Sequence, residues 1–296
     1  MCSNRWAEDV AAALEEVASQ VAEVPRSDAV LIASGVTESQ LEQLRALADS
    51  LGVAMRESGP GLSVARNAAL ALAGDGDVVA YVDDDALPAP GWLKNLASHW
   101  EDASPDLACI GGAIEPHWAA PPPEWVSERV YVVFSLLDRG PGVQPLEPGV
   151  EDAWGANVSF RAGPLRQAGG FDPALGPVGG IPFFADETEA QRRLAAAGYR
   201  GIYAGDVRVR HRVGPERLRL REVLRRRFYA GAGMRRIGQW GLAAGAARLA
   251  GGLAGMGAAL VRRRPEDLAV AIGRFGAGAG VLAEPLVRRR LASLRR

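Results

Sequence analysis

The chain has few of the side chains that form disulfides or bind metals through sulfur. Its 296 residues include only two cysteines, Cys2 and Cys109, and one lysine, Lys94. The two cysteines match neither a zinc-binding spacing nor a disulfide framework, which is typical of proteins from a reducing cytoplasm. No signal-peptide pattern comes before the first acidic helix pattern. We therefore expect a cytoplasmic protein.

The net charge of −1 hides a strong asymmetry along the chain. Residues 206–296 contain 21 arginines and 6 acidic residues, a net charge of +15. Residues 1–205 contain 13 basic and 29 acidic residues, a net charge of −16. A basic tail of this kind can meet an anionic surface, a phosphate-bearing ligand or the acidic part of the same chain.

Strands and helices alternate in the first 82 residues. The hydrophobic spacing and the turn residues predict, in order, a helix over 5–24, a strand over 29–33, a helix over 37–51, a strand over 53–55, a helix over 63–73 and a strand over 77–82. Thr37 and Gln40 have the spacing of a capping box. Strands that alternate with helices predict a mostly parallel sheet with right-handed crossovers.

The pattern is less regular after residue 106. It predicts strands over 107–112, 154–160, 202–204 and 207–211, a helix over 186–197 that ends at Gly198, and a helical tail from residue 218. The proline- and glycine-rich stretch Gly140–Gly149 predicts a mobile functional loop.

Three consecutive aspartates, Asp83, Asp84 and Asp85, follow the apolar run Val78–Val82. This order places negative charge at the carboxyl edge of a sheet, where open α/β sheets bind their ligands. Three neighbouring carboxylates repel one another, and Mg²⁺ or Mn²⁺ is the simplest compensation because these ions prefer carboxylate oxygens. The alternative is an acidic turn that caps the next helix.

Several motifs occur together in one order. They are Ser63–Asn67, Asp83–Pro88, Trp154–Phe160, Gly169–Asp172, Asp186–Glu189 with Leu194 and Gly198–Tyr199, and Val209–His211. In this order they resemble the family 2 glycosyltransferases of the GT-A fold, over roughly residues 3–215. The resemblance implies a Rossmann-like α/β domain with a mostly parallel central sheet flanked by helices. It also implies a nucleotide-sugar donor, a divalent metal and inversion at the anomeric carbon.

The resemblance assigns metal and donor residues by position. Asp83 and Asp85 are the outer members of the Asp-x-Asp motif, in which Asp83 faces the ribose or sugar of the donor and Asp85 holds Mn²⁺ or Mg²⁺. Asp83 is also a candidate metal ligand, and Asp84 lies between the two in the donor site. His211 resembles a late histidine that completes the metal sphere; by itself it would be a surface residue.

Three further basic or amide side chains belong to the predicted donor site. Asn4 and Arg5 resemble the Asn-Arg turn after the first strand of the family. Arg66 either contacts phosphate or forms an ion pair with an acidic neighbour, and we favour the ion pair.

The acid pair Asp186-Glu187 supplies the candidate general base. The resemblance implies a base that takes the proton of the acceptor hydroxyl on the face of the sugar opposite to the leaving diphosphate. Alignment from Gly198 backwards favours Glu187, with Asp186 as the alternative. Acidic residues at a helix start also complement the helix dipole, which lowers a carboxylate pKa. Trp154 and Asn157 either line the acceptor or sugar pocket or belong to the core of a strand.

Two departures from the family pattern concern the nucleotide pocket. Only Met1, Cys2 and Ser3 come before Asn4, so the first strand of the family is predicted to be missing. The strand that ends at Ala33-Ser34-Gly35 carries no aspartate to read the nucleobase, so UDP, dTDP and GDP donors all stay open. These departures favour the alternative of a non-catalytic GT-A-like binding or scaffold protein.

The tail contains two long, mostly apolar stretches. Residues 241–261 contain one charge, Arg248, and residues 268–287 contain Arg274 and Glu284. Their lengths suit membrane spans, but alanine and glycine contribute little transfer free energy. We expect helix packing within one chain or across a homodimer first, peripheral contact with the inner membrane surface second, and spanning last. We expect no nucleic-acid binding, because the basic region has few aromatics and no recognised motif.

The sequence therefore predicts a metal-dependent inverting glycosyltransferase with a GT-A domain over 1–215 and a basic, helical region over 216–296. The acceptor is a natural product, a cell-surface glycan or a lipid carrier, and a polyprenyl-phosphate sugar transferase at the membrane surface is an alternative function.

Overall fold

The structure, a computed structural model, describes residues 1–147, 149 and 151–294. The chain forms two compact units, and each is described by itself. The first unit contains residues 1–115, 137–173 and 186–212. The second unit contains residues 116–136 and 174–185 and the chain from residue 213 onward. The functional division at residue 215 stays a prediction.

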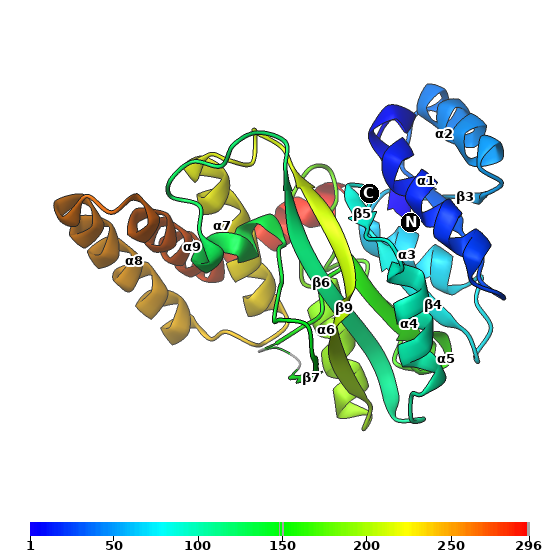
Figure 1. Cartoon of the computed structure of the whole chain (residues 1–296). Helices are drawn as coiled ribbons and strands as arrows, with labels where there is room; N and C mark the ends of the chain where they lie inside the picture. The colour runs from blue at the N-terminus through cyan, green and yellow to red at the C-terminus, as the bar shows by residue number, and fades with distance from the viewer. Residues whose placement is uncertain (148, 150, 295–296) are drawn as a thin grey trace. The chain divides into compact units, whose positions relative to one another are not determined.

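A parallel three-stranded sheet opens the first unit. Its strands are β1 (Cys2–Ser3), β2 (Val30–Ser34) and β3 (Ala54–Ser58), in the order β1-β2-β3. The crossover helices are α1 (Ala7–Glu23) and α2 (Glu38–Ser50) (Figure 1). Val10, Leu14, Leu31 and Leu44 are fully buried between them. The predicted capping box is confirmed, because the Thr37 side chain accepts from the Gln40 backbone N–H.

The prediction of a missing first strand is corrected. Cys2 and Ser3 pair in parallel with Ile32 and Ala33, so the strand exists in a two-residue form. An isolated parallel bridge also joins Cys2 to Asp83. Two residues are too few to be recognised as a strand from the sequence. Only their pairing with distant segments defines Cys2 and Ser3 as strand β1.

A six-stranded sheet forms the rest of the first unit's framework. Its strands are β4 (Val78–Val82), β5 (Ala86–Pro88), β6 (Leu107–Trp118), β7 (Val143–Leu146), β8 (Asn157–Arg161) and β9 (Arg200–Val213). The order is β4-β8-β6-β9-β5, and β7 also pairs with β9. Strand β8 pairs antiparallel with β4 and β6, and β9 pairs antiparallel with β5 and β7.

The α/β fold class is confirmed, but the sheet is mixed. Parallel neighbours need a crossover of a dozen or more residues, which α1 and α2 provide only for β1 to β3. The two strands predicted over 202–204 and 207–211 are one long strand, β9. Part of the loop predicted over 140–149 is strand β7, and residue 148 of that loop lies outside the described residues.

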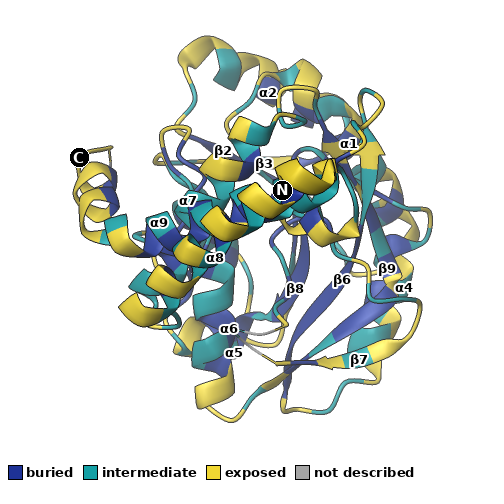
Figure 2. Ribbon diagram, turned by 90° about the vertical axis from the view of Figure 1, so that its left-hand side faces the viewer, coloured by how far each residue is buried: buried dark blue, intermediate teal, exposed yellow. Residues whose placement is uncertain are grey.

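Helices and aromatic residues pack on this sheet. The helices are α3 (Leu62–Leu70), α4 (Trp92–Glu101), α5 (Ala162–Gln167) and α6 (Asp186–Ala196). Tyr81, Phe160 and Phe171 meet edge to face, with ring centroids 5.3–6.3 Å apart. Figure 2 shows β6 and β8 buried along much of their length. This core holds the ends of β4 and α6 in fixed positions.

The second unit is largely helical. A 3₁₀ helix, η1 (Glu128–Phe134), is joined by α7 (Leu220–Arg236), α8 (Leu242–Arg262) and α9 (Pro265–Leu294) (Figure 1). A Cβ atom on Gly280 would lie 1.8 Å from the Phe228 carbonyl oxygen of α7, and one on Gly278 would lie 2.4 Å from the Leu249 nitrogen of α8. These glycines therefore allow the close packing within one chain that the small residues predicted.

Two helices of the second unit are long and apolar enough to cross a membrane by length and composition. The apolar window of α8 is 17% buried and that of α9 is 44% buried. A mostly buried core helix also passes this test of length and composition. Neither of these two windows is mostly buried.

Candidate active site at the end of strand β4

The three aspartates form a tight turn between β4 and β5. The Ala86 N–H donates to the Asp83 carbonyl at 3.1 Å, which reverses the chain directly after Val82. Strand β4 then pairs with β8, while β5 pairs with β9. The turn places the three neighbouring carboxylates in different surroundings, and none of them caps a helix.

Asp83, Asp85 and His211 come together as a group that can hold a metal ion. One ligand atom from each residue lies within 4.8 Å of the others. Ala86 is the register partner of His211 on β9, so the histidine lies beside Asp85, with Nε2 3.0 Å from Oδ1. Two carboxylate oxygens and one imidazole nitrogen suit Mn²⁺, and the carboxylates suit Mg²⁺. The donor set therefore fits the predicted divalent cation.

Asp84 points to the N-terminal strand. The Ser3 hydroxyl donates to Asp84 Oδ2, and Arg5 Nε lies 3.2 Å from Asp84 Oδ1. Arg5 Nη2 also reaches Asp85 Oδ2 at 2.7 Å. Burial raises the pKa of Asp84 to about 7, although the charge of Arg5 opposes the shift. Asp84 and Arg5 thus join β1 to the turn, while Asn4 is exposed and its carbonyl accepts from the Gln40 side chain at 3.3 Å.

Arg66 on α3 is shared by carboxylates from two other parts of the chain. Its side chain is only 2% exposed. Nη1 lies 2.9 Å from Asp186 Oδ2 and 3.0 Å from Glu187 Oε1, and Nη2 lies 3.8 Å from Asp83 Oδ1. Burial alone would lower the pKa of the guanidinium, but these three carboxylates raise it above its usual value. The ion pair favoured from the sequence is therefore present.

The acid pair at the start of α6 is asymmetric. Asp186 is fully buried, and its Oδ2 accepts from the Ser63 hydroxyl at 2.8 Å and from Arg66 at 2.9 Å. Burial, together with the neighbouring Glu187, raises the pKa of Asp186 to about 8. Glu187 is 12% exposed at its side chain, and Arg66 outweighs burial and lowers its pKa. The pKa of Asp186 therefore lies above that of Glu187.

Gly155 packs directly against this cluster and was not identified from the sequence. A Cβ atom there would lie 1.9 Å from Arg66 Nη2 and 2.3 Å from Glu187 Oε1. The sequence marked Gly155 only by its position directly after Trp154, within the Trp154–Phe160 motif. Ser3 and Ser63 were also missed, because a lone serine has no pattern that predicts a distant carboxylate partner.

Trp154 and Asn157 differ in their surroundings. Trp154 is half-buried beside Gly155. The Asn157 side chain donates to the Ala113 and Val207 carbonyls at 2.9 and 2.8 Å and accepts from the Trp92 indole at 2.9 Å. It is 2% exposed and is fully engaged within the sheet. Asn157 is therefore a core residue, the second of its two predicted roles.

A parallel sheet that continues into a mixed sheet, with a metal-capable Asp-x-Asp turn where they meet, defines the class of GT-A folds. The family described as "Glycosyl transferase family 2" matches residues 1–139. Residues 1–139 are therefore similar to members of that family.

Two curated relatives each match 58% of the chain. A glucosyl-dolichyl phosphate glucuronosyltransferase of Haloferax volcanii is 33% identical over 172 residues, which is 58% of this chain and 54% of the relative. A pre-mycofactocin glycosyltransferase of Mycobacterium tuberculosis is 29% identical over 175 residues, or 58% of this chain and 34% of the relative. The matches thus span about half or less of the length of these relatives.

Solved structures share the fold over more of the chain. A mannosyltransferase from Pyrobaculum calidifontis, solved with GDP-Man and Mn²⁺, has a TM-score of 0.61 and 21% identity, and covers 95% of this chain and 85% of its own. Glucosyl-3-phosphoglycerate synthase from Mycobacterium tuberculosis, in complex with phosphoglyceric acid, has a TM-score of 0.52 and 13% identity, and covers 81% of this chain and 79% of its own. These likenesses establish the GT-A fold.

Proposed function

We propose that this chain is a metal-dependent inverting glycosyltransferase that moves a sugar from a nucleotide-sugar donor to an acceptor hydroxyl. One observation carries the proposal. The group Asp83, Asp85 and His211 is joined through Asp83 to the buried cluster of Arg66, Asp186 and Glu187. A cation site and an acid pair of unequal pKa therefore lie next to each other, as transfer from a diphosphate requires.

The donor side of the site is assigned to the β4 turn and β1. Asp85, Asp83 and His211 would hold Mn²⁺ or Mg²⁺, which when bound supplies Lewis-acid stabilisation of the diphosphate leaving group. Asp83 also faces the ribose or sugar, and Asn4 and Arg5 lie on the same side. Arg5 neutralises Asp84 and Asp85 in the absence of a cation.

Glu187 is the proposed general base. It is ionised at neutral pH and partly exposed, so it can accept the proton of an acceptor hydroxyl. Asp186 has the higher pKa of the pair and contacts Arg66 and Ser63, so we assign it a positioning role. Gly155 leaves room for the Glu187 carboxylate, and the neighbouring Trp154 is the proposed wall of the sugar or acceptor pocket.

The relatives favour particular substrates. The name of the Haloferax relative refers to a glucosyl-dolichyl phosphate, and the Pyrobaculum neighbour was solved with GDP-Man. We propose a UDP-, dTDP- or GDP-type donor and, as the favoured acceptor, a sugar on a polyprenyl-phosphate carrier at the inner membrane surface. Helix α8 is apolar and little buried, which supports an acceptor at the membrane surface. A non-catalytic binding protein is the competing function.

The test is transfer and donor hydrolysis with UDP-, dTDP- and GDP-sugars, each with and without Mn²⁺. We expect Glu187→Gln to lower the transfer rate by about 10²–10⁴-fold while donor binding persists. Asp85→Ala should abolish the Mn²⁺-dependent rate. The matched control is Glu189→Gln. This change removes one negative charge from the same helix, where Glu189 forms an ion pair with Arg193, and it should leave the transfer rate unchanged.

Two results would count against the proposal. Full turnover by Asp85→Ala would remove the metal role of the turn. Donor binding without transfer or hydrolysis by the wild type, across all donors, would favour the binding protein instead.

A further inference from the structure

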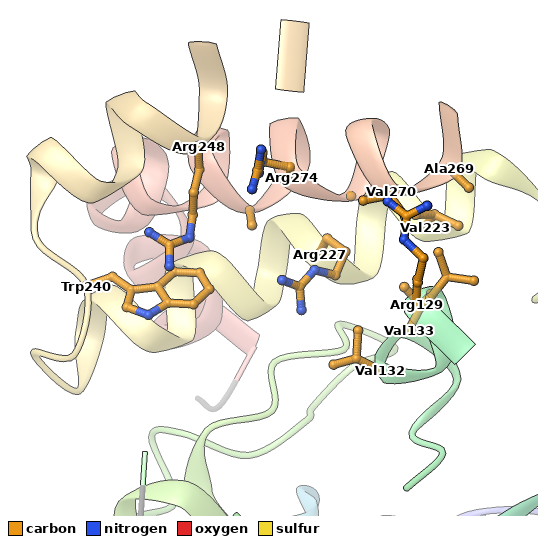
Figure 3. A pocket seen from close by; sticks show the side chains of 13 residues that line it. Arg129, Val132, Val133, Val223, Arg227, Trp240, Arg248, Ala269, Val270 and Arg274 are labelled. Carbon is orange, nitrogen blue, oxygen red and sulfur yellow. The ribbon is translucent and has the colours of Figure 1, made fainter. Parts of the chain in front are cut away.

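The second unit contains a cavity lined by several arginines. Its volume is about 270 Å³. Arg227 of α7, Arg248 of α8, Arg274 of α9 and Arg129 of η1 contribute to its lining, together with valines and Trp240. Figure 3 shows Arg227 and Arg248 reaching into it from two different helices. All of these residues belong to the second unit, and none of them is a residue of the candidate active site.

Only one of these four arginines is neutralised by carboxylates. Arg129 Nη1 lies 3.0 Å from Glu266 and 2.7 Å from Asp267. In the part of the chain that the structure describes, no ion pair joins Arg227, Arg248 or Arg274 to a carboxylate. Arg227 and Arg248 are half-buried and repel each other, whereas Arg274 is exposed to solvent.

Arg227 faces a second cation, Arg248, with no described carboxylate beside it. Burial, followed by the charge of Arg248, lowers the pKa of its guanidinium. Arg227 is half-buried, and a cation withdrawn from water without a carboxylate partner is unfavourable. The cavity can therefore offer an anion cationic groups that no described carboxylate neutralises.

Trp240 gives the cavity a rigid wall. The guanidinium carbon of Arg248 lies 3.8 Å from the centre of the indole ring, which holds the side chain over the ring face (Figure 3). The Arg248 Nη1 also donates to the Ala244 carbonyl at 3.2 Å. Arg248 is thus oriented before any ligand binds, which reduces the entropy lost on binding.

We propose that this cavity binds a phosphate or diphosphate group through Arg227 and Arg248, with Arg274 at its exposed side. Guanidinium groups match phosphate oxygens with directed, charge-assisted hydrogen bonds. The valines at the other wall suit an apolar portion attached to the phosphate. The group comes either from a soluble phosphate compound or from a lipid headgroup, and the two share this chemistry. The proposal does not depend on glycosyl transfer.

The test uses the full chain in metal-free buffer and two probes. Sodium pyrophosphate is titrated by calorimetry, and vesicles of phosphatidylcholine with and without phosphatidic acid are tested by co-sedimentation. The variants are Arg227→Gln and Arg248→Gln. The control is Arg289→Gln, an exposed position in α9 outside the cavity, which removes the same charge from the same unit.

We expect each cavity variant to bind roughly ten- to a hundredfold more weakly than the wild type, and the control to bind as the wild type does. Binding of pyrophosphate with this pattern identifies a soluble source. The same pattern with phosphatidic acid vesicles alone identifies a lipid source. Arg227 is not among the candidate active-site residues, so a loss of pyrophosphate binding in Arg227→Gln identifies the cavity as the binding site.

Two outcomes would overturn the proposal. One is an equal loss of binding in the cavity variants and in Arg289→Gln, which would mean a diffuse attraction to the basic tail. The other is no binding of either probe by the wild type. The fold is checked by circular dichroism, and Arg227→Gln should unfold at the same temperature as the wild type or higher, since it removes an uncompensated charge.

Discussion

Replacing Arg66 by methionine tests the cluster at the start of α6. The guanidinium compensates Asp186, Glu187 and Asp83 at 2.9, 3.0 and 3.8 Å. Methionine fills much of the same space but leaves these acids without a cation. Loss of one partner of a buried ion pair typically costs about 3–5 kcal/mol. We therefore expect the free energy of unfolding at pH 7 to fall by that amount, out of a typical total of about 5–15 kcal/mol.

The assay is urea unfolding followed by the fluorescence of the seven tryptophans. The loss should shrink as the pH falls from 7 to 5, because protonated carboxyls no longer need a cation. The matched control is Arg45→Met, whose ion pair with Glu57 is more than half exposed on both sides and should contribute about 0.2–1 kcal/mol. If Arg66→Met costs no more than the control, the buried cluster does not stabilise the fold as argued.

Two further predictions concern the same cluster. Asp186 has a pKa of about 8 in the folded protein, above its unfolded value, so the folded state binds more protons and stability falls as the pH rises from about 4 to 8. Asp186→Asn should flatten this slope by up to about 1.4 kcal/mol per pH unit, and an unchanged slope in urea melts across that range would contradict the assignment. Gly155→Ala should cost about 1–3 kcal/mol, because its Cβ collides with Arg66. The control is Gly257→Ala in α8, where an added Cβ meets nothing within 4 Å. This change should stabilise the folded protein by about 0.4–1 kcal/mol. Equal shifts of the melting temperature in the two variants would refute the contact between Gly155 and Arg66.

Much of the fold could be predicted because its signals are local. The capping box at Thr37 and Gln40 needs only a spacing of three residues, and the helix start at Asp186 needs only its acidic first turn. The apolar run before Asp83 likewise predicts its own strand. The pairing of strands could not be read in this way, since β8 and β9 run antiparallel to neighbours far away in the sequence. A two-residue strand such as Cys2–Ser3 has no local signal at all.

The candidate site divides in the same manner. The motif order indicated Asp83, Asp85 and His211, and the register of β5 with β9 brings His211 to Asp85. The roles within the acid pair stayed open in the sequence, because Asp186 and Glu187 are adjacent and chemically alike. Burial and the contacts of Ser63 and Arg66 separate their pKa values.

The sequence by itself determined the identity and order of the ionisable groups, the alternation of helices and strands, and the concentration of arginine in the tail. The tertiary structure decided which groups share a cation and which stay without one. Arg66 and Asp186 are 120 positions apart, yet their side chains lie 2.9 Å from each other. Charge interactions depend on distance and burial rather than on order along the chain, so the raised pKa of Asp186 and the lack of a described carboxylate beside Arg227 emerge only when the chain is folded.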